Sequence, residues 1–356
     1  MSFRQLISPF ICVPIIGLCA VSLFLIATTA PDLFWAQAVF FFLGLIILLF
    51  FSSIDFRIWL KFKNFIYIVT ILILLISFLG PEVRGSTRWI DLGFFRLQPS
   101  ELIKPFLIII MAAFLSENPI TNLPSLLKPI LLLFPFIFLI FKQPDLGNVL
   151  VYLSILASLI ILSGISWVYI LLSFLGITGL LPFFWFILKD YQKQRLLSFL
   201  NPQQDPIGAG YNSLQAVIAI GSGKIMGMGL GRGTQSRLMF LPEYHTDFVF
   251  ASLGEVLGFL GGALVILLYL FLLYKILIIA INTENIFGKF IILGVFAQLF
   301  SQVFINLGMN LGLLPITGIT LPLISYGGSS IISTFIDLGL VISVASYHKK
   351  SPLVIR

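Results

Sequence analysis

The stretch FVFASLGEVLGFLGGALVILLYLFLLY, residues 248–274, decides the fold class of this chain. It holds one charged side chain, Glu255, and about 20 apolar residues are enough to cross a bilayer as a helix. Similar apolar runs fill the sequence, since 59% of its residues are hydrophobic and only 10% are charged. A soluble domain is about one quarter charged. The sequence therefore predicts an all-α, polytopic integral membrane protein.

Ten segments are apolar and long enough to be membrane helices, and we expect them to form one membrane domain over residues 1–356. They are 7–29, 34–54, 64–80, 99–117, 126–143, 146–163, 167–188, 247–274, 286–309 and 319–346. With a cytoplasmic N-terminus, the inner tails and short loops hold ten Lys and Arg, against four in the short outer loops. This bias predicts cytoplasmic N- and C-termini. It also predicts one large extracytoplasmic loop, 189–246, between the seventh and eighth helices, with helical spacing over 211–220.

Composition also restricts the kinds of partner. The net charge of +7 in so apolar a chain indicates anionic membrane lipids and not nucleic acid. The two cysteines, Cys12 and Cys19, lie in the first apolar run and indicate neither a disulfide framework nor a metal site.

Three titratable side chains, Glu243, His245 and Asp247, lie directly before the run at 248–274. Neighbouring carboxylates and partial burial raise the pKa of a carboxyl group, which suits a general base. Asp247 could instead be a helix N-cap, and the cluster could also be an ordinary solvated rim. A metal site needs more ligands at suitable spacing, so we predict none; an Mg²⁺ ion shared with a substrate pyrophosphate stays open as an alternative.

Ionisable residues within predicted membrane helices are expensive and therefore functional candidates. Glu101 and Lys104 are three residues apart on one helix face, so they either neutralise each other or line an outward-facing aqueous cavity. Asp145 precedes the sixth helix and is expected to cap it. Asp337 lies in the tenth helix, and no role for it follows from the sequence.

Glycines alternate with other residues from Gly221 to Gly233, but Ile225 follows Lys224 where a phosphate-binding P-loop needs Ser or Thr. We therefore do not predict a nucleotide site there. Arg232 in this segment could contact a lipid phosphate.

Seven motifs together resemble the SEDS family (shape, elongation, division and sporulation), which includes RodA and FtsW. They are Arg88-Trp89-Ile90-Asp91, Gln98-Pro99-Ser100-Glu101-Leu102-Ile103-Lys104, Gln143-Pro144-Asp145-Leu146-Gly147, residues 201–211, Gly233-Thr234-Gln235-Ser236, residues 241–247 and residues 321–330. The run at 233–236 favours the RodA branch, while residues 320–325 also suit FtsW. Val256 stands where the family commonly has a second glutamate.

The resemblance implies a peptidoglycan glycosyltransferase that polymerises lipid II on the outer face of the bacterial inner membrane, in cell-wall elongation and shape control. It implies that Asp247 is the catalytic residue and that Glu101, Lys104, Asp145 and Trp89 belong to the site. We expect Asp247 to accept a proton from the acceptor sugar, and the lipid pyrophosphate to leave against positive charge. Lys104, Arg88, Arg195 and Arg232 are candidates for that charge, with Trp89 stacking on a sugar and Glu243 and His245 as supports.

No cofactor is evident in the sequence, apart from the Mg²⁺ alternative above. The resemblance implies a class B penicillin-binding protein (a transpeptidase) and other elongation or division complex proteins as partners. Three alternatives stay open at this point. A lipid II flippase would use Glu101, Lys104 and Asp337 as a translocation path. The other two are an FtsW-like division polymerase and a non-catalytic membrane scaffold.

Overall fold

The structure is a computed structural model that describes residues 9–348, except 81–86, 92, 94–95, 201–208, 230, 239 and scattered residues between 167 and 189. The described part is almost entirely helical, with one pair of two-residue strands. The prediction of an all-α, multi-pass membrane protein is confirmed.

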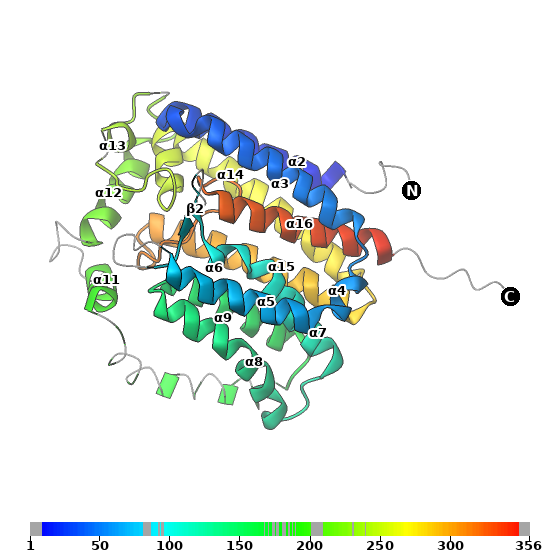
Figure 1. Cartoon of the computed structure of the whole chain (residues 1–356). Coiled ribbons are helices and arrows are strands. Elements are labelled where there is room, and N and C mark those ends of the chain that lie inside the picture. Colours follow the sequence, from blue (N-terminus) through cyan, green and yellow to red (C-terminus); the bar gives the residue numbers. More distant parts are fainter. Residues whose placement is uncertain are drawn as a thin grey trace.

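The elements pack side by side as a bundle of long helices (Figure 1). In chain order they are α2 (Pro9–Thr29), η1 (Pro31–Leu33), α3 (Phe34–Ser53), α4 (Arg57–Lys61), α5 (Lys63–Ile76), η2 (Ser77–Leu79), β1 (Ile90–Asp91), β2 (Arg96–Leu97), α6 (Pro99–Leu102), α7 (Lys104–Glu117), α8 (Leu123–Lys142), α9 (Leu146–Leu162), α11 (Asp190–Leu200), α12 (Ala209–Ser222), α13 (Thr234–Arg237), α14 (Val249–Ile281), α15 (Ile286–Asn310) and α16 (Gly328–His348).

Six helices in the described part of the chain are long and apolar enough to cross a membrane by length and composition. They are Ile11–Thr29, Pro31–Ser53, Leu123–Lys142, Val249–Ile281, Ile286–Asn310 and Gly328–Tyr347. Lys63–Leu79 and Leu146–Leu162 are shorter apolar helices, and the fourth predicted span is divided into α6 and α7. The seventh predicted span, 167–188, lies largely outside the described residues, so the count of ten stays a prediction.

Two predicted boundaries are wrong. The eighth predicted span, 247–274, is a 33-residue helix that continues to Ile281 and is interrupted at Gly258, where φ is +67°. The tenth predicted span, 319–346, begins as a helix only at Gly328. The reason lies in residues 319–327, whose backbone groups bond elsewhere: the N–H of Leu321 donates to Ser325 Oγ at 2.8 Å and the N–H of Tyr326 donates to the carbonyl of His245 at 2.8 Å.

The predicted loop 189–246 is largely helical where it is described. Its helices α11, α12 and α13 lie at one end of the bundle, and α12 covers the helix expected over 211–220 (Figure 1). The start of α2 and the end of α16 lie at the opposite end (Figure 1), as expected if both termini face one side of the membrane. We call the α11–α13 end the outer end.

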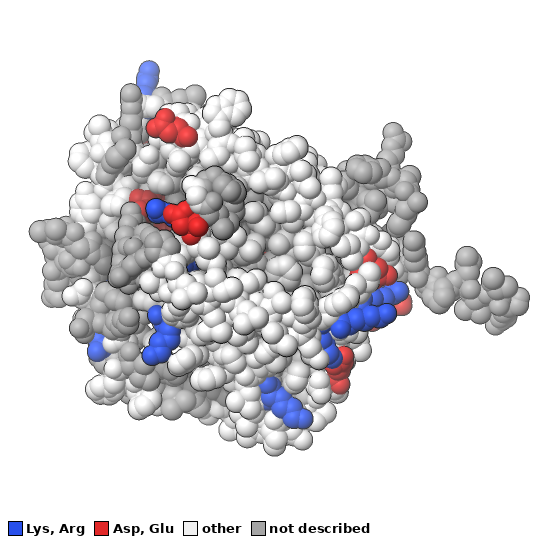
Figure 2. All heavy atoms as spheres, viewed as in Figure 1, with Lys and Arg blue, Asp and Glu red and all other residues white. Residues whose placement is uncertain are grey.

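Charged side chains gather mostly toward the two ends in Figure 2, and a broad uncharged face lies between them. Such a face is what a lipid-exposed surface requires, because a charge in hydrocarbon is expensive.

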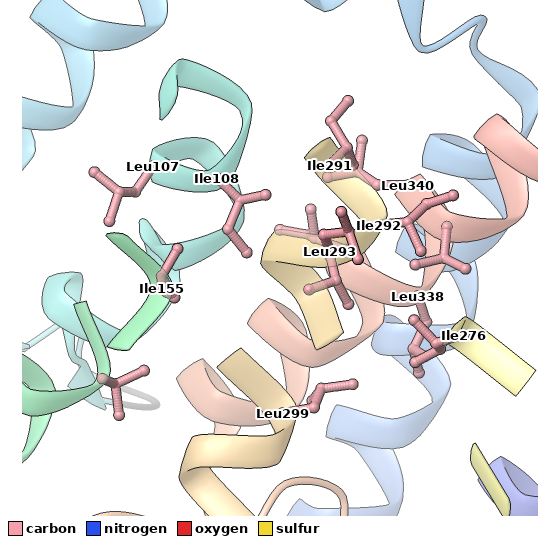
Figure 3. Packing of buried hydrophobic residues seen from close by; sticks show 14 of the residues in the cluster. Leu107, Ile108, Ile155, Ile276, Ile291, Ile292, Leu293, Leu299, Leu338 and Leu340 are labelled. Atoms are coloured by element: carbon pink, nitrogen blue, oxygen red, sulfur yellow. The ribbon is translucent and has the colours of Figure 1, made fainter. Parts of the chain in front are cut away.

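Helix α15 is the centre of the packing, in contact with α7, α9, α14 and α16. In Figure 3, Ile291, Ile292, Leu293 and Leu299 of α15 lie between side chains of α7 and α9 and side chains of α16. This apolar core fixes α15 and α16, which carry the polar side chains described below.

Candidate active site

Asp247 lies at the outer end, in the turn that precedes α14. Its backbone carbonyl accepts hydrogen bonds from Asn306 Nδ2 at 3.0 Å and from Asn310 Nδ2 at 3.1 Å, both on α15. Its side chain is only partly buried. The alternative that Asp247 caps α14 is wrong. The N-cap residue is Phe248, and the start of α14 has no side-chain capping bond. The backbone of Asp247 is therefore fixed by α15, while its side chain is only partly buried.

The loop at 321–326 supports the same turn. Ser325 Oγ donates to the carbonyl of Thr246 at 2.6 Å. The ring of His245 packs edge-on against the rings of Tyr244 and Tyr326, with centroids 5.0 and 5.8 Å apart. His245 thus packs within the turn, and its role as a support of Asp247 stays a prediction. Glu243 accepts a hydrogen bond from Thr246 Oγ1 at 3.1 Å.

Asp145 is buried, with 3% of its surface exposed, and its carboxylate is fully engaged. Its Oδ2 accepts from Gln98 Nε2 and Ser100 Oγ, both at 2.8 Å, and from Asn148 Nδ2 at 2.9 Å. Its Oδ1 accepts from the N–H of Asn148 at 3.3 Å, so the prediction that Asp145 caps α9 is confirmed.

Arg88 joins Asp145 to Asp247. Its Nη1 lies 4.0 Å from Asp145 Oδ1, and its positive charge acts on the Asp247 carboxylate. Its Nε is buried without an acceptor among the described residues. We call Arg88, Asp145 and Asp247 the outer site. Asp145 and Asp247 are about a hundred residues apart in sequence, and the charge of Arg88, which lies 4.0 Å from Asp145, also acts on Asp247.

Residues 316–319 form a loop that lies close to both Asp145 and Asp247. A Cβ added at Gly147, beside Asp145, would lie 2.6 Å from the carbonyl oxygen of Thr317. A Cβ added at the next residue, Gly318, would lie 3.4 Å from Asp247 Oδ2, and Gly318 has φ of +74°. The loop therefore runs against the start of α9 and against Asp247, and glycine at 147 and 318 permits both approaches.

Burial raises the pKa of Asp247 to about 6, and the negative charge of Glu243 acts in the same direction, while Arg88 and Arg195 act in the opposite direction. A carboxylate with a pKa near 6 is ionised at neutral pH and is still a better proton acceptor than an ordinary aspartate. The sequence-based expectation of a raised pKa from burial and a neighbouring acid agrees with this environment.

Arg195, Arg232 and Trp89 were also predicted to contact substrate, and they differ in exposure. Arg195 on α11 is exposed, and its Nη1 lies 3.4 Å from the carbonyl oxygen of Ile316. Arg232 is exposed just before α13, and Trp89 is half-buried next to Arg88. Their predicted contacts with substrate stay predictions.

Glu101 and Lys104 are inside the bundle. Lys104 Nζ lies 2.7 Å from Glu101 Oε1, and the two side chains are 6% (Glu101) and 0% (Lys104) exposed. Of the two interpretations left open by the sequence, this geometry favours the self-neutralising pair over an outward-facing aqueous lining. The charges of both residues reach Asp337, whose Oδ2 accepts from Gln298 Nε2 at 2.6 Å. We call Glu101, Lys104, Asp337 and Gln298 the inner cluster.

Glu255 anchors α13 to α14. It is 0% exposed, and its carboxylate accepts the N–H groups of Gln235 at 2.7 Å and Ser236 at 3.0 Å, together with the Ser236 hydroxyl. The carbonyl of Gln235 in turn accepts the N–H of Leu241 at 3.1 Å, six residues before Asp247. The carboxylate that the sequence marked as intramembrane is thus a hydrogen-bond acceptor for a helix N-terminus.

Residues 223–229, the glycine segment, dock against the interruption in α14. The N–H of Met228 donates to the carbonyl of Glu255 at 2.9 Å and the N–H of Phe259 donates to the carbonyl of Lys224 at 2.9 Å. A Cβ at Gly227 would lie 2.1 Å from the carbonyl oxygen of Val256. The glycines therefore permit backbone-to-backbone packing, in agreement with the sequence-based rejection of a P-loop.

The sequence did not single out Asn306, Asn310 or Ser325 individually, although they hold the turn that carries Asp247. Asn306 and Asn310 lie four residues apart on α15, which places them on one face. That spacing is the signal that could have identified them.

Comparison with known proteins shows the family of this chain. The family model for FtsW, RodA and SpoVE, described as a cell cycle protein, matches residues 5–350. Peptidoglycan glycosyltransferase MrdB of Escherichia coli strain K12 is 40% identical over 313 residues, which cover 86% of this chain and 84% of that protein. Stage V sporulation protein E of Bacillus subtilis is 37% identical over 320 residues, covering 88% of this chain and 87% of that protein.

Solved structures show the same fold. A chain from a structure described as "Structural coordination of polymerization and crosslinking by a peptidoglycan synthase complex" has a TM-score of 0.84 and 31% identity, covering 96% of this chain and 98% of that chain. Thermus thermophilus rod shape determining protein RodA has a TM-score of 0.72 and 27% identity, covering 96% of this chain and 97% of that one. The resemblance to the SEDS family is confirmed. This chain therefore belongs to the FtsW/RodA/SpoVE family of cell cycle proteins.

Proposed function

We propose that this peptidoglycan glycosyltransferase polymerises lipid II at the outer face of the bacterial inner membrane, with Asp247 as the general base. The outer site lies at one end of a bundle of apolar helices, where a lipid-linked sugar can present its head group while its chain stays in the bilayer. The names of the relatives support the reaction class, and the similarity to a rod shape determining protein supports a role in elongation and shape.

The proposed step is a single displacement at the anomeric carbon of the donor. The 4-hydroxyl oxygen of the acceptor sugar bonds to that carbon, its proton passes to Asp247, and the bond from the carbon to the pyrophosphate oxygen breaks. The electron pair of that bond leaves with the lipid diphosphate. A base on one side and fixed positive charge on the other lower the barrier to such a step.

Arg88 is the cation that we assign to the departing pyrophosphate. The observation that carries this proposal is its position between two acids, 4.0 Å from Asp145 Oδ1 and within electrostatic reach of Asp247. Its buried Nε has no acceptor among the described residues, so the guanidinium retains hydrogen-bonding capacity for a phosphate. Arg195 and Arg232 are exposed nearby and suit an arriving anionic head group.

We propose a class B penicillin-binding protein as partner, supported by the similarity to a chain of a complex described as coordinating polymerization and crosslinking. Among the described residues no group of three or more His, Cys, Asp or Glu could hold a metal. If an Mg²⁺ ion takes part, Asp247 and Glu243 are the carboxylates that would hold it, and it would supply positive charge to the substrate pyrophosphate.

The test is glycan synthesis from lipid II by the purified protein with its transpeptidase partner. Asp247→Asn is expected to lower the rate about 10²–10⁴-fold while lipid II binding is retained. Asp32→Asn is the matched control, because Asp32 is an exposed aspartate in the first turn of η1.

Equal polymer from wild type and Asp247→Asn would contradict the assigned role. Lipid II translocation in liposomes without polymer would favour the flippase. The inner cluster is enclosed, with Lys104 and Asp337 both 0% exposed, so this structure does not support an open translocation path there.

A further inference from the structure

A seam of buried polar side chains runs along the contact between α15 and α16. On α15, Gln298, Gln302, Asn306 and Asn310 follow one another at intervals of four residues and are each at most 1% exposed. Residues four apart lie on one face of a helix. On α16, Ser333 and Asp337 are also four apart and are 1% and 0% exposed.

The two helices are antiparallel, so the seam has matching levels. The end of α15 and the start of α16 both bond to residues 319–320 at the outer end. Asn306 Nδ2 of α15 donates to the carbonyl of Ile319 at 2.7 Å, and Ser330 Oγ of α16 lies 2.9 Å from Thr320 Oγ1. The bond of 2.6 Å from Gln298 Nε2 to Asp337 Oδ2 fixes the inner level. Gln302 and Ser333 are each one helical turn closer to the outer end, so this register places them at the same level.

The hydrogen-bonding capacity of the inner part of the seam is not satisfied. Glu101 Oε2, Asp337 Oδ1, Gln298 Oε1, Gln302 Oε1 and Ser333 Oγ are buried oxygens without a hydrogen-bond partner among the described residues. The first four can only accept when the carboxyls are ionised. The residues that carry them are each at most 5% exposed, and such groups are rarely left unpaired in a protein interior.

The charges are unbalanced in the same place. Lys104 pairs with Glu101 through a contact of 2.7 Å. The charges of both also act on Asp337. With Asp337 ionised, the cluster holds two carboxylates and one ammonium, so one negative charge is uncompensated. An uncompensated buried charge is strongly unfavourable.

We propose that the unpaired oxygens of Glu101, Asp337, Gln298, Gln302 and Ser333 bind one monovalent cation, with Na⁺ as the occupant. Carboxylate, amide and hydroxyl oxygens are hard ligands suited to such ions. One positive charge brings the cluster to neutrality, whereas a divalent ion leaves a positive charge in excess beside Lys104. The site lies inside the bundle and is separate from the glycosyl-transfer step.

The test is the dependence of thermal unfolding on Na⁺ in purified protein, at constant ionic strength with choline chloride as the replacement salt. A ligand that binds only the folded state stabilises it increasingly with its concentration, so the wild-type midpoint is expected to rise with the logarithm of the Na⁺ concentration. Asp337→Asn keeps an oxygen for the bond to Gln298 and removes the charge, so its midpoint is expected not to depend on Na⁺.

Two further variants keep the test decisive. Ser343 lies on the same helix as Asp337 but away from the cluster, and its hydroxyl donates to the carbonyl of Ile54 at 2.6 Å. Ser343→Ala removes this bond and is expected to keep the full Na⁺ dependence. Ser333→Ala removes one proposed ligand and is expected to weaken Na⁺ binding several-fold in a ²³Na NMR titration, which serves if Asp337→Asn fails to fold.

A wild-type midpoint that is identical in Na⁺ and choline overturns the proposal. If that midpoint instead rises on acidification, a proton on Asp337 neutralises the cluster, and the proposal is likewise overturned. Equal Na⁺ dependence in wild type and Asp337→Asn would show that the ion binds elsewhere, and it overturns the proposal too.

Discussion

The outer site and the inner cluster each contain a buried aspartate near a cation, yet the two aspartates have different surroundings. Asp145 is 3% exposed and accepts four hydrogen bonds, with Arg88 at 4.0 Å. Asp337 is 0% exposed and accepts one from the described residues, donated by Gln298. Burial alone therefore does not define the role of an acid in this bundle; the number of donors around it does. Asp145 is arranged to hold Arg88, whereas Asp337 retains the capacity to bind something else.

The largest effect is expected from removing one half of the buried pair. Lys104→Met leaves Glu101 buried without its cation, which costs about 3–5 kcal/mol of unfolding free energy. The matched control is Lys63→Met, because Lys63 pairs with Glu117 at the surface, where the side chains are 29% and 43% exposed, and such pairs contribute about 1 kcal/mol or less. Equal losses in chemical unfolding would contradict the distinction between the two environments.

Arg88→Ala should next lower the polymerisation rate about 10²–10³-fold, since it removes the fixed charge opposite the leaving group. The control is Arg96→Ala, whose guanidinium lies 3.4 Å from the exposed Asp91 in the same β1–β2 pair. Combining Arg88→Ala with Asp145→Asn should cost less than the sum of the single effects, because the two side chains act together. Rate losses that simply add would show that Asp145 and Arg88 act independently.

Glu255→Gln should destabilise the protein by about 1–3 kcal/mol, because the new amide group faces the N–H groups of Gln235 and Ser236. Polymerisation should fall with it, since α13 leads to the catalytic turn. Glu284→Gln, at an exposed position after α14, is the control for the loss of a charge. An unchanged melting temperature in Glu255→Gln would show that the anchor is dispensable.

The smallest effect is a shift in pH dependence. The pKa of Asp247 is raised to about 6, so the rate should fall about tenfold per pH unit below that value. Glu243 raises this pKa and Arg195 lowers it. Glu243→Gln should therefore move the acid limb to lower pH, and Arg195→Gln should move it to higher pH. Shifts in the same direction would mean that Asp247 is not the group observed.

The linked effect on stability has a definite sign. Because the folded-state pKa of Asp247 lies above its ordinary value of 3.8, the folded protein binds this proton more tightly than the unfolded chain does. The contribution of Asp247 to stability therefore falls as pH rises from about 4 to about 6. Asp247→Asn should remove this part of the pH dependence, measured as the unfolding midpoint against pH.

The sequence predicted the membrane class and most of the helices, because long apolar runs are local signals. It did not predict that Arg88 lies between Asp145 and Asp247, since that contact depends on how three distant segments pack. It placed Glu101 and Lys104 correctly as a pair, but their depth in the bundle depends on α15 and α16. The strands β1 and β2 were not predicted, because two residues carry almost no periodic signal.

The docking of the glycine segment has a consequence for biosynthesis. The chain emerges from the ribosome in order, so residues 223–229 are made before their partners at 255–260. Several of their N–H groups and carbonyls are bonded to that later segment, and their glycines favour no structure in isolation. The segment can be completed only after α14 has entered the membrane. Folding of the outer end is therefore a late event, controlled by the insertion of the helix that follows it.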